Sequence, residues 1–297
     1  LYIGMFRPSL GKEPRWFGNL KRYQLALFNS IPRVADVNSE EAINSASGFP
    51  KPCAQSFWTD DSDTYWENLG IDPPVDGECA DPDVTESVWS DLPDGYFVEK
   101  GGAGQQLRVL ESAGVRNLLT VSDENTLRPL EVAAGDAVAM GGQPVYDYFI
   151  GDETGTDEAA PVAGLRASIH GDVVHSSPLA FRHASDSVTI YYGTNSGDYR
   201  AVSGADGTER WSLVAPEHFE KLDRLYENYP LVEYTGAEEE QGFQHDPKDY
   251  FFDGSTGLIA GYDGDNALSY AYIYPTMRRG GRMVYALDVT DPDENPE

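Results

Sequence analysis

The stretch Gly171–Trp211 reads GDVVHSSPLAFRHASDSVTIYYGTNSGDYRAVSGADGTERW, and its pattern decides the fold. It contains three short β-rich segments: Val188–Tyr192, Tyr199–Val202 and Glu209–Trp211. Turns at Gly193–Asp198 and Ser203–Thr208 separate them, and their glycines supply the positive φ that such turns need. A strand, a tight turn, a strand, an Asp-Gly turn and a third strand are typical of one antiparallel β-propeller blade. Because propellers serve both as enzymes and as binding platforms, the blade leaves the function open.

The rest of the chain favours the same class. It has 297 residues with 30 glycines, 19 prolines and 12% aromatic residues, which suits a turn-rich β-protein. Ala215–Glu227 is the one clear helix candidate, since Phe219 and Leu222 fall at helical spacing. Apolar residues are sparse in residues 28–94, where we expect a loop-rich insertion. We predict that residues 1–297 form part of one all-β dominated, irregular β-propeller domain with loop-rich insertions and a few short helices.

The charge restricts the partners. Lysine and arginine number 21 against 50 aspartates and glutamates, which gives a net charge of −29. Such a surface repels phosphate, so nucleic acid is excluded as a partner. No apolar run approaches the roughly 20 residues of a membrane span. Because the chain starts at Leu1 and ends directly after a predicted strand, we expect it to be a fragment of a longer protein.

The two cysteines and one acidic turn are the remaining candidate sites. Cys53 and Cys79 lie in loop sequence without zinc-site spacing, and we favour a disulfide over two free thiols. Asp263, Asp265 and Asn266 resemble the start of a calcium-binding loop. The later acidic ligand is absent there, and calcium needs six to eight oxygens, so this is a weak calcium candidate.

No motif of a known catalytic class is complete. The Gly193–Gly197 turn has Asn195 where a nucleophile elbow needs serine. His170 and His175 lack the spacing of a zinc helix, and we expect core or loop histidines. The glycines of Gly101–Gly104 lack the third glycine of a dinucleotide loop, so they predict a turn.

Three tryptophans, Trp58, Trp66 and Trp89, lie in the predicted insertion. One interpretation is that they pack the insertion onto the propeller. The other is that they form a sugar- or protein-binding surface. On the second interpretation, the acidic, tryptophan-bearing insertion is the working surface of the protein.

Several motifs resemble those of PilY1-type proteins, the type IV pilus assembly and adhesion factors, and occur in the same order. The matching segments are Trp16–Tyr23 (WFGNLKRY), Trp89–Ala103, Arg116–Thr120, Gly171–Pro178 (GDVVHSSP), Tyr192–Asn195, Asp249–Gly254 (DYFFDG) and Gly280–Pro292 (GGRMVYALDVTDP). The resemblance covers nearly the whole chain and points to the C-terminal propeller of that family. Residues Asn195–Val202 depart from it, because the family usually has a histidine there. The family's calcium loop generally follows the YALDVT strand and would lie beyond Glu297.

The resemblance implies a non-enzymatic role at the pilus tip, on the cell surface, reached through the periplasm. Its implied partners are minor pilins and a host or surface ligand, and its implied cofactor is calcium. Two alternatives stay open. Ser203–Trp211 also resembles the blade repeat of quinone-dependent dehydrogenases, although Trp211 alone fits that repeat clearly. The other alternative is a carbohydrate-binding surface propeller.

Overall fold

The structure is a computed structural model that describes residues 1–67, 89–152, 164–184, 187–234, 242–265 and 267–297. Strands dominate it, as predicted. The strands are β1 (Tyr2–Arg7), β2 (Phe17–Arg22), β3 (Gln24–Phe28), β4 (Ile31–Ala35), β5 (Leu118–Val121), β6 (Leu127–Pro129), β7 (Leu179–Ala184), β8 (Ser187–Gly193), β9 (Asp198–Ser203), β10 (Glu209–Val214), β11 (Leu231–Val232), β12 (His245–Asp246), β13 (Gly257–Tyr262), β14 (Leu268–Tyr274) and β15 (Leu287–Asp288). The helices are α1 (Gly102–Ser112), α2 (Asp136–Ala139), α3 (Gln143–Ile150) and α4 (Phe219–Glu227), with short 3₁₀ turns η2 (Val132–Ala134) and η3 (Pro216–His218).

The predicted blade is the centre of the largest sheet. Strands β8, β9 and β10 occupy the three predicted segments and pair antiparallel, so that prediction is confirmed. β7 pairs antiparallel with the other edge of β8. β5 pairs in parallel with β10, and β6 pairs antiparallel with the other edge of β5. The strand order is therefore β6-β5-β10-β9-β8-β7.

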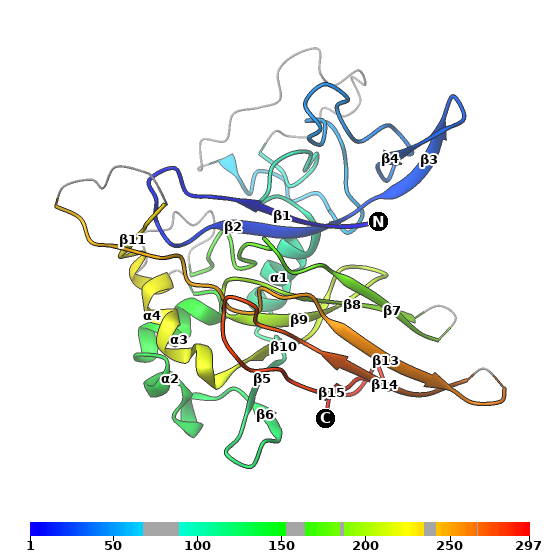
Figure 1. Cartoon of the computed structure of the whole chain (residues 1–297). Helices are drawn as coiled ribbons and strands as arrows, with labels where there is room; N and C mark the ends of the chain where they lie inside the picture. The colour runs from blue at the N-terminus through cyan, green and yellow to red at the C-terminus, as the bar shows by residue number, and fades with distance from the viewer. Residues whose placement is uncertain (68–88, 153–163, 185–186, 235–241, 266) are drawn as a thin grey trace.

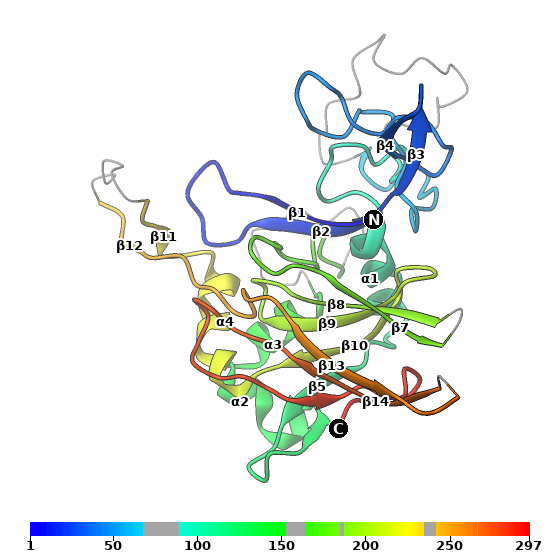
Figure 2. The same cartoon turned by 45° about the vertical axis from the view of Figure 1, so that its right-hand side comes forward.

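Three sheets are stacked, with the six-stranded sheet between the other two (Figures 1 and 2). Side chains alternate along a strand, so Tyr191 and Ala201 share one face of the central sheet. They pack with Ile273 of the sheet β13-β14-β15. Ile190 and Tyr192 point to the other face, where they pack with β2 and α1. Both faces of β8 are thus buried, which explains why Val188–Tyr192 consists of β-branched and aromatic residues.

The helices α2, α3 and α4 cover one end of the central sheet (Figure 1). Strand β10 runs almost directly into η3 and α4, which confirms the helix predicted over Ala215–Glu227. Phe219, Leu222 and Leu225 form its buried side and pack against α3 and Val214.

The described strands do not close into a ring. The described residues contain no closed propeller, so the prediction of an all-β dominated fold is confirmed and the propeller stays a prediction. The outer face of the last sheet is exposed and apolar. Ile259, Tyr270 and Tyr272 lie on it, with exposed fractions of 53%, 41% and 38%.

Candidate functional site

The motif at Trp16–Tyr23 places a buried lysine in the middle of β2. The Lys21 side chain is fully buried, and its Nζ lies 3.0 Å from the Asp94 carboxylate, which is also fully buried. Nζ also donates to the carbonyl oxygens of Asp94 and Phe97, at 3.0 and 2.7 Å. Asp94 accepts hydrogen bonds from the Ser56 N–H and hydroxyl. Because a buried charge is stable only with such partners, this ion pair ties the end of the predicted insertion to β2.

A second motif residue, Asn19, fixes the start of α1. Its Nδ2 donates to the Gly101 carbonyl, and its Oδ1 accepts the Gly104 N–H at 2.8 Å. Gly101 and Gly102 have φ of +63° and +56°, and a Cβ on Gly102 would approach the Leu20 carbonyl oxygen to 2.7 Å. The amides at this helix start therefore bond to the protein, which argues against a phosphate loop. The predicted turn is limited to Gly101, because Gly102–Gly104 form the first turn of α1.

Three further motifs converge at one end of the central sheet. His175 Nδ1 lies 2.9 Å from both carboxylate oxygens of the buried Asp253. Asn195 donates through Nδ2 to Asp172 at 2.7 Å, and Lys248 Nζ lies 3.1 Å from the same carboxylate. These residues belong to segments that are far apart in sequence. The cluster therefore joins the segment before β7, the β8–β9 turn and the segment before β13.

This junction contains a histidine–carboxylate pair, which in an enzyme could orient a general base. The adjacent Ser176 hydroxyl, however, accepts a hydrogen bond from the Gly193 N–H at 2.8 Å, so it satisfies a main-chain donor of β8. His175 therefore lies in a hydrogen-bonded loop, which is one of the two environments that we expected for it.

A buried ionic cluster lies within the blade itself. Arg116 donates to both carboxylate oxygens of Glu209, at 3.0 and 3.2 Å. Arg200 pairs with Glu209 and with Asp198, and these side chains are at most 2% exposed. Burial alone would raise the pKa of Glu209, but Arg116 and Arg200 outweigh it and hold that pKa at about 2. The cluster fixes the register of β9 and β10 against Arg116, which precedes β5.

Two histidines are buried in their neutral form. His170 Nε2 lies 2.7 Å from the Tyr192 hydroxyl, and burial lowers the His170 pKa to about 3. His218 packs between Phe251 and Phe252, and burial likewise lowers its pKa to about 3. Both are core histidines, as predicted for the histidines of this chain.

We expect the free energy of unfolding to fall as the pH drops from 7.5 to 5.0. The unfolded chain gains a proton on each histidine below about pH 6.5, whereas folded His170 and His218 stay neutral down to about pH 3. Each should therefore cost about 2 kcal/mol over this range. Urea unfolding at several pH values measures the effect, and His218→Phe should remove about half of it. A free energy that is constant between pH 7.5 and 5.0 would show that these side chains accept protons in the fold.

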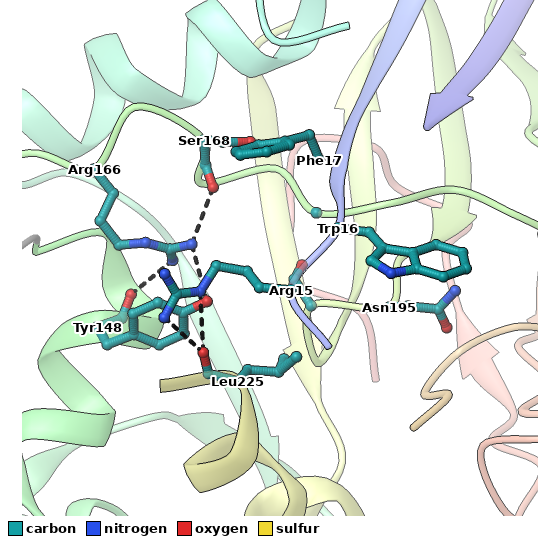
Figure 3. Close-up of a pocket in the computed structure, with 10 residues that line it drawn as sticks. Arg15, Trp16, Phe17, Tyr148, Arg166, Ser168, Asn195 and Leu225 are labelled. Atoms are coloured by element: carbon teal, nitrogen blue, oxygen red, sulfur yellow. Dashed lines mark hydrogen bonds between the residues drawn. The ribbon is translucent and has the colours of Figure 1, made fainter. Parts of the chain in front are cut away.

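Two arginines stack on one tyrosine beside the helical end (Figure 3). The Arg166 guanidinium lies 3.7 Å from the Tyr148 ring centroid and that of Arg15 lies 4.9 Å away. Arg15 also donates to the Leu225 carbonyl at 2.9 Å. The cavity that they line measures about 10 Å³, which leaves space for one water at most. This cluster joins the β1–β2 loop to the helices and offers no room for a ligand.

The tryptophan-bearing surface that the sequence suggested is not present at Trp58 or Trp66. Their exposed fractions are 9% and 1%. The Trp58 ring stacks on Tyr2 at 5.6 Å, and its Nε1 donates to the Ala205 carbonyl. Trp66 packs edge-on against Tyr65. Trp58 thus attaches the insertion to the sheets, as the packing interpretation proposed. Trp66 packs under Arg108 of α1, and Trp89 is half-buried.

The disulfide and calcium candidates are described in part. Cys53 is half-buried and is not a free thiol, but Cys79 lies outside the described residues, so their pairing stays a prediction. Asp263 Oδ1 accepts the N–H groups of Asp265 and Ala267, which closes the β13–β14 turn. Asn266 lies outside the described residues. Within the described residues, no group of three aspartate, glutamate, histidine or cysteine side chains could hold a metal ion. Calcium binding there also stays a prediction.

An apolar groove lies between β1 and the loop that follows β4. Its volume is about 720 Å³, which is in the range of ligand pockets. Its walls include Ile3, Met5 and Phe6 from β1 and Ile43, Phe49 and Pro50 from the loop. Phe6 and Phe49 are 42% and 67% exposed. Sequence reasoning missed this groove, because neither wall carries a recognisable motif.

Comparison with curated proteins gives three matches that bear on function. The chain is 26% identical over 155 residues to the type IV pilus biogenesis factor PilY1 of Pseudomonas aeruginosa strain UCBPP-PA14, covering 43% of this chain and 12% of that protein. It is 26% identical to a PilY1 homolog of Xylella fastidiosa strain Temecula1, covering 52% and 13%. It is 23% identical to PilY1 of Pseudomonas aeruginosa strain PAK, covering 70% and 19%.

The chain is similar to PilY1 over part of its length. It spans less than a fifth of the length of these relatives. No protein-family model and no solved structure matches it. Within the described part of the chain, no helix is long and apolar enough to cross a membrane. Several residues of the motifs that resemble those of PilY1-type proteins, among them Lys21, Asn195 and Asp253, form the buried junctions described above.

Proposed function

We propose that this chain belongs to a type IV pilus biogenesis and adhesion factor, exported through the periplasm, that acts at the pilus tip. In this role it contacts minor pilins, supports pilus extension and attaches the cell to a surface ligand by binding, without enzymatic chemistry. The similarity to PilY1 supports the role in pilus biogenesis. The structural observation that most supports this proposal is that three separate motifs that resemble PilY1-type proteins meet in one cluster, formed by Asp172, His175, Asn195 and Asp253.

We also propose that the three stacked sheets are blades of a propeller. The exposed face with Ile259, Tyr270 and Tyr272 supports this, because a following blade would bury such a face. A structure of a longer stretch of the native protein tests it. A further sheet packed on this face is expected, and a face that is open to solvent would contradict the propeller.

Deletion of the gene is expected to abolish surface pili, because extension would lose its tip factor. Pili per cell counted by electron microscopy, together with attachment to a solid surface, measure the result. Restoring the intact gene should restore both. Normal piliation and attachment in a clean deletion strain would rule out this function.

The alternatives have less support from the structure. Trp211, which suggested a quinone-dependent propeller, is 3% exposed and packs among Tyr191 and Tyr199 in the core, as the closing tryptophan of any blade would, so it gives that alternative no separate support. Trp58 and Trp66, which suggested sugar binding, are buried as well.

A further inference from the structure

Residues 277–283 form a short loop between β14 and β15. The antiparallel bridge between Thr276 and Val284 closes this loop, so its two ends lie side by side. Gly280, near its middle, is buried, and a Cβ there would lie only 1.8 Å from the Phe251 carbonyl oxygen. The loop is therefore packed closely against the body of the protein, which gives it a defined shape.

This loop carries three arginines, Arg278, Arg279 and Arg282, and all three are exposed. Three of the 21 basic residues of the chain thus lie within five positions of one another. Because the loop is closed and short, their side chains start from neighbouring points on the surface. Among the described residues, none of the three forms an ion pair.

The carboxylates around the loop leave these arginines without a counter-charge. Asp249 pairs with Arg224 at 3.0 Å. Glu217 and Glu220 line a cleft next to the loop, together with the β5–β6 turn, and neither pairs with the three arginines. Lys221 donates through Nζ to a carbonyl of the loop and adds a further positive charge. In a chain with a net charge of −29, the loop is thus a local surplus of positive charge.

Two of the arginines are held in particular conformations. The Arg279 guanidinium lies 5.4 Å from the Tyr250 ring centroid and donates to the Tyr250 hydroxyl at 3.4 Å, which orients it. Arg278 has a φ of +48°, in the left-handed region that glycine adopts without strain and arginine does not. Because this conformation costs stability, it indicates that the Arg278 side chain has a purpose other than folding.

We propose that residues 278–282 bind an acidic segment of a partner protein, whose carboxylates pair with the three guanidinium groups. A guanidinium fits a carboxylate through two parallel hydrogen bonds. A segment with several carboxylates can pair with all three arginines at once, whereas a single small anion cannot. This binding goes beyond the proposed pilus role and does not depend on it.

The net charge of −29 restricts the partner further. It repels a long polyanion, an anionic membrane and a second copy of this acidic chain. Repulsion beyond about 8 Å is screened at physiological ionic strength, so the charges of the loop decide whether a short acidic segment binds.

Selection of a displayed library of short random peptides on the intact chain tests the proposal. Peptides that also bind the triple variant Arg278→Gln/Arg279→Gln/Arg282→Gln are removed by counter-selection. The remaining peptides are expected to contain several aspartates or glutamates. The most enriched peptide is then synthesised, and its affinity is measured by fluorescence anisotropy. The triple variant should bind it at least about tenfold more weakly, and added salt should weaken its binding to the intact chain.

Two further variants separate the role of the loop from net charge and from folding. Arg7→Gln/Arg33→Gln/Lys51→Gln removes three positive charges from ion pairs elsewhere, so the affinity should change by less than about twofold. Arg278→Gly should weaken the peptide by about threefold, and it should keep or raise the midpoint of urea unfolding because glycine relieves the left-handed strain.

Several results would overturn the proposal. The first is a selection that enriches no peptide, or peptides without acidic residues. The second is an equal loss of affinity in the charge-matched variant. Displacement of the peptide by millimolar inorganic phosphate would assign the loop to a small anion instead. Dimers in sedimentation that the triple variant abolishes would assign it to a second copy.

Discussion

Lys21→Met is expected to lower the free energy of unfolding by about 3–5 kcal/mol, because it leaves the Asp94 carboxylate buried without its cation. The carbonyl oxygens of Asp94 and Phe97 would lose their donor at the same time. Urea unfolding followed by tryptophan fluorescence measures the change. Because the ion pair joins β2 to the insertion, we expect the whole chain to be destabilised rather than one loop.

Two comparisons separate the loss of this buried ion pair from the effect of removing any basic side chain. Arg33→Met breaks an ion pair with Glu41 whose side chains are 40% and 27% exposed, so it should cost about 1 kcal/mol or less. The double variant Lys21→Met/Asp94→Leu removes both charges and should be more stable than Lys21→Met alone. A loss below about 1 kcal/mol for Lys21→Met would show that the junction contributes little to the fold.

Trp211→Ala should cost about 3–5 kcal/mol, since it opens a cavity between two of the stacked sheets. Trp211 is 3% exposed, and its ring centroid lies 6.0 Å from that of Tyr191 and 6.2 Å from that of Tyr199. Trp211→Phe keeps part of the apolar surface and should cost less. The same urea measurement applies to both variants.

The matched control for this core residue is Val138→Ala. Val138 is 82% exposed, so the change should stay within about 0.5 kcal/mol. If Trp211→Ala lowered the free energy of unfolding by no more than Val138→Ala does, the stacking of the sheets would not depend on this aromatic contact.

The sequence was most informative where local signals and tertiary packing agree. Val188–Tyr192 is β-branched and aromatic, and its flanking turns contain glycine, so β8 and its neighbours could be placed correctly. The spacing of Phe219 and Leu222 similarly located α4. The stacking of the three sheets could not be derived, because it depends on contacts between whole sheets rather than on local pattern.

The candidate site was harder to predict, because its parts come from distant segments. A lysine in the middle of a strand is usually exposed, and the partner of Lys21 lies 73 residues away. Trp58 lies in a polar loop sequence that suggests exposure, yet Tyr2 and Ala205 bury it. The groove could not be foreseen, since β1 and the loop at Phe49 form it only when the fold brings them together.

The location of the native protein on the pilus is the most direct test of the proposed role. An epitope tag inserted beside Leu10, which is 99% exposed, can be labelled with gold on intact cells. We predict label at the free ends of pili, together with normal numbers of pili in the tagged strain. Label along the pilus shaft, or confined to the cell body while pili remain unlabelled, would contradict a tip factor.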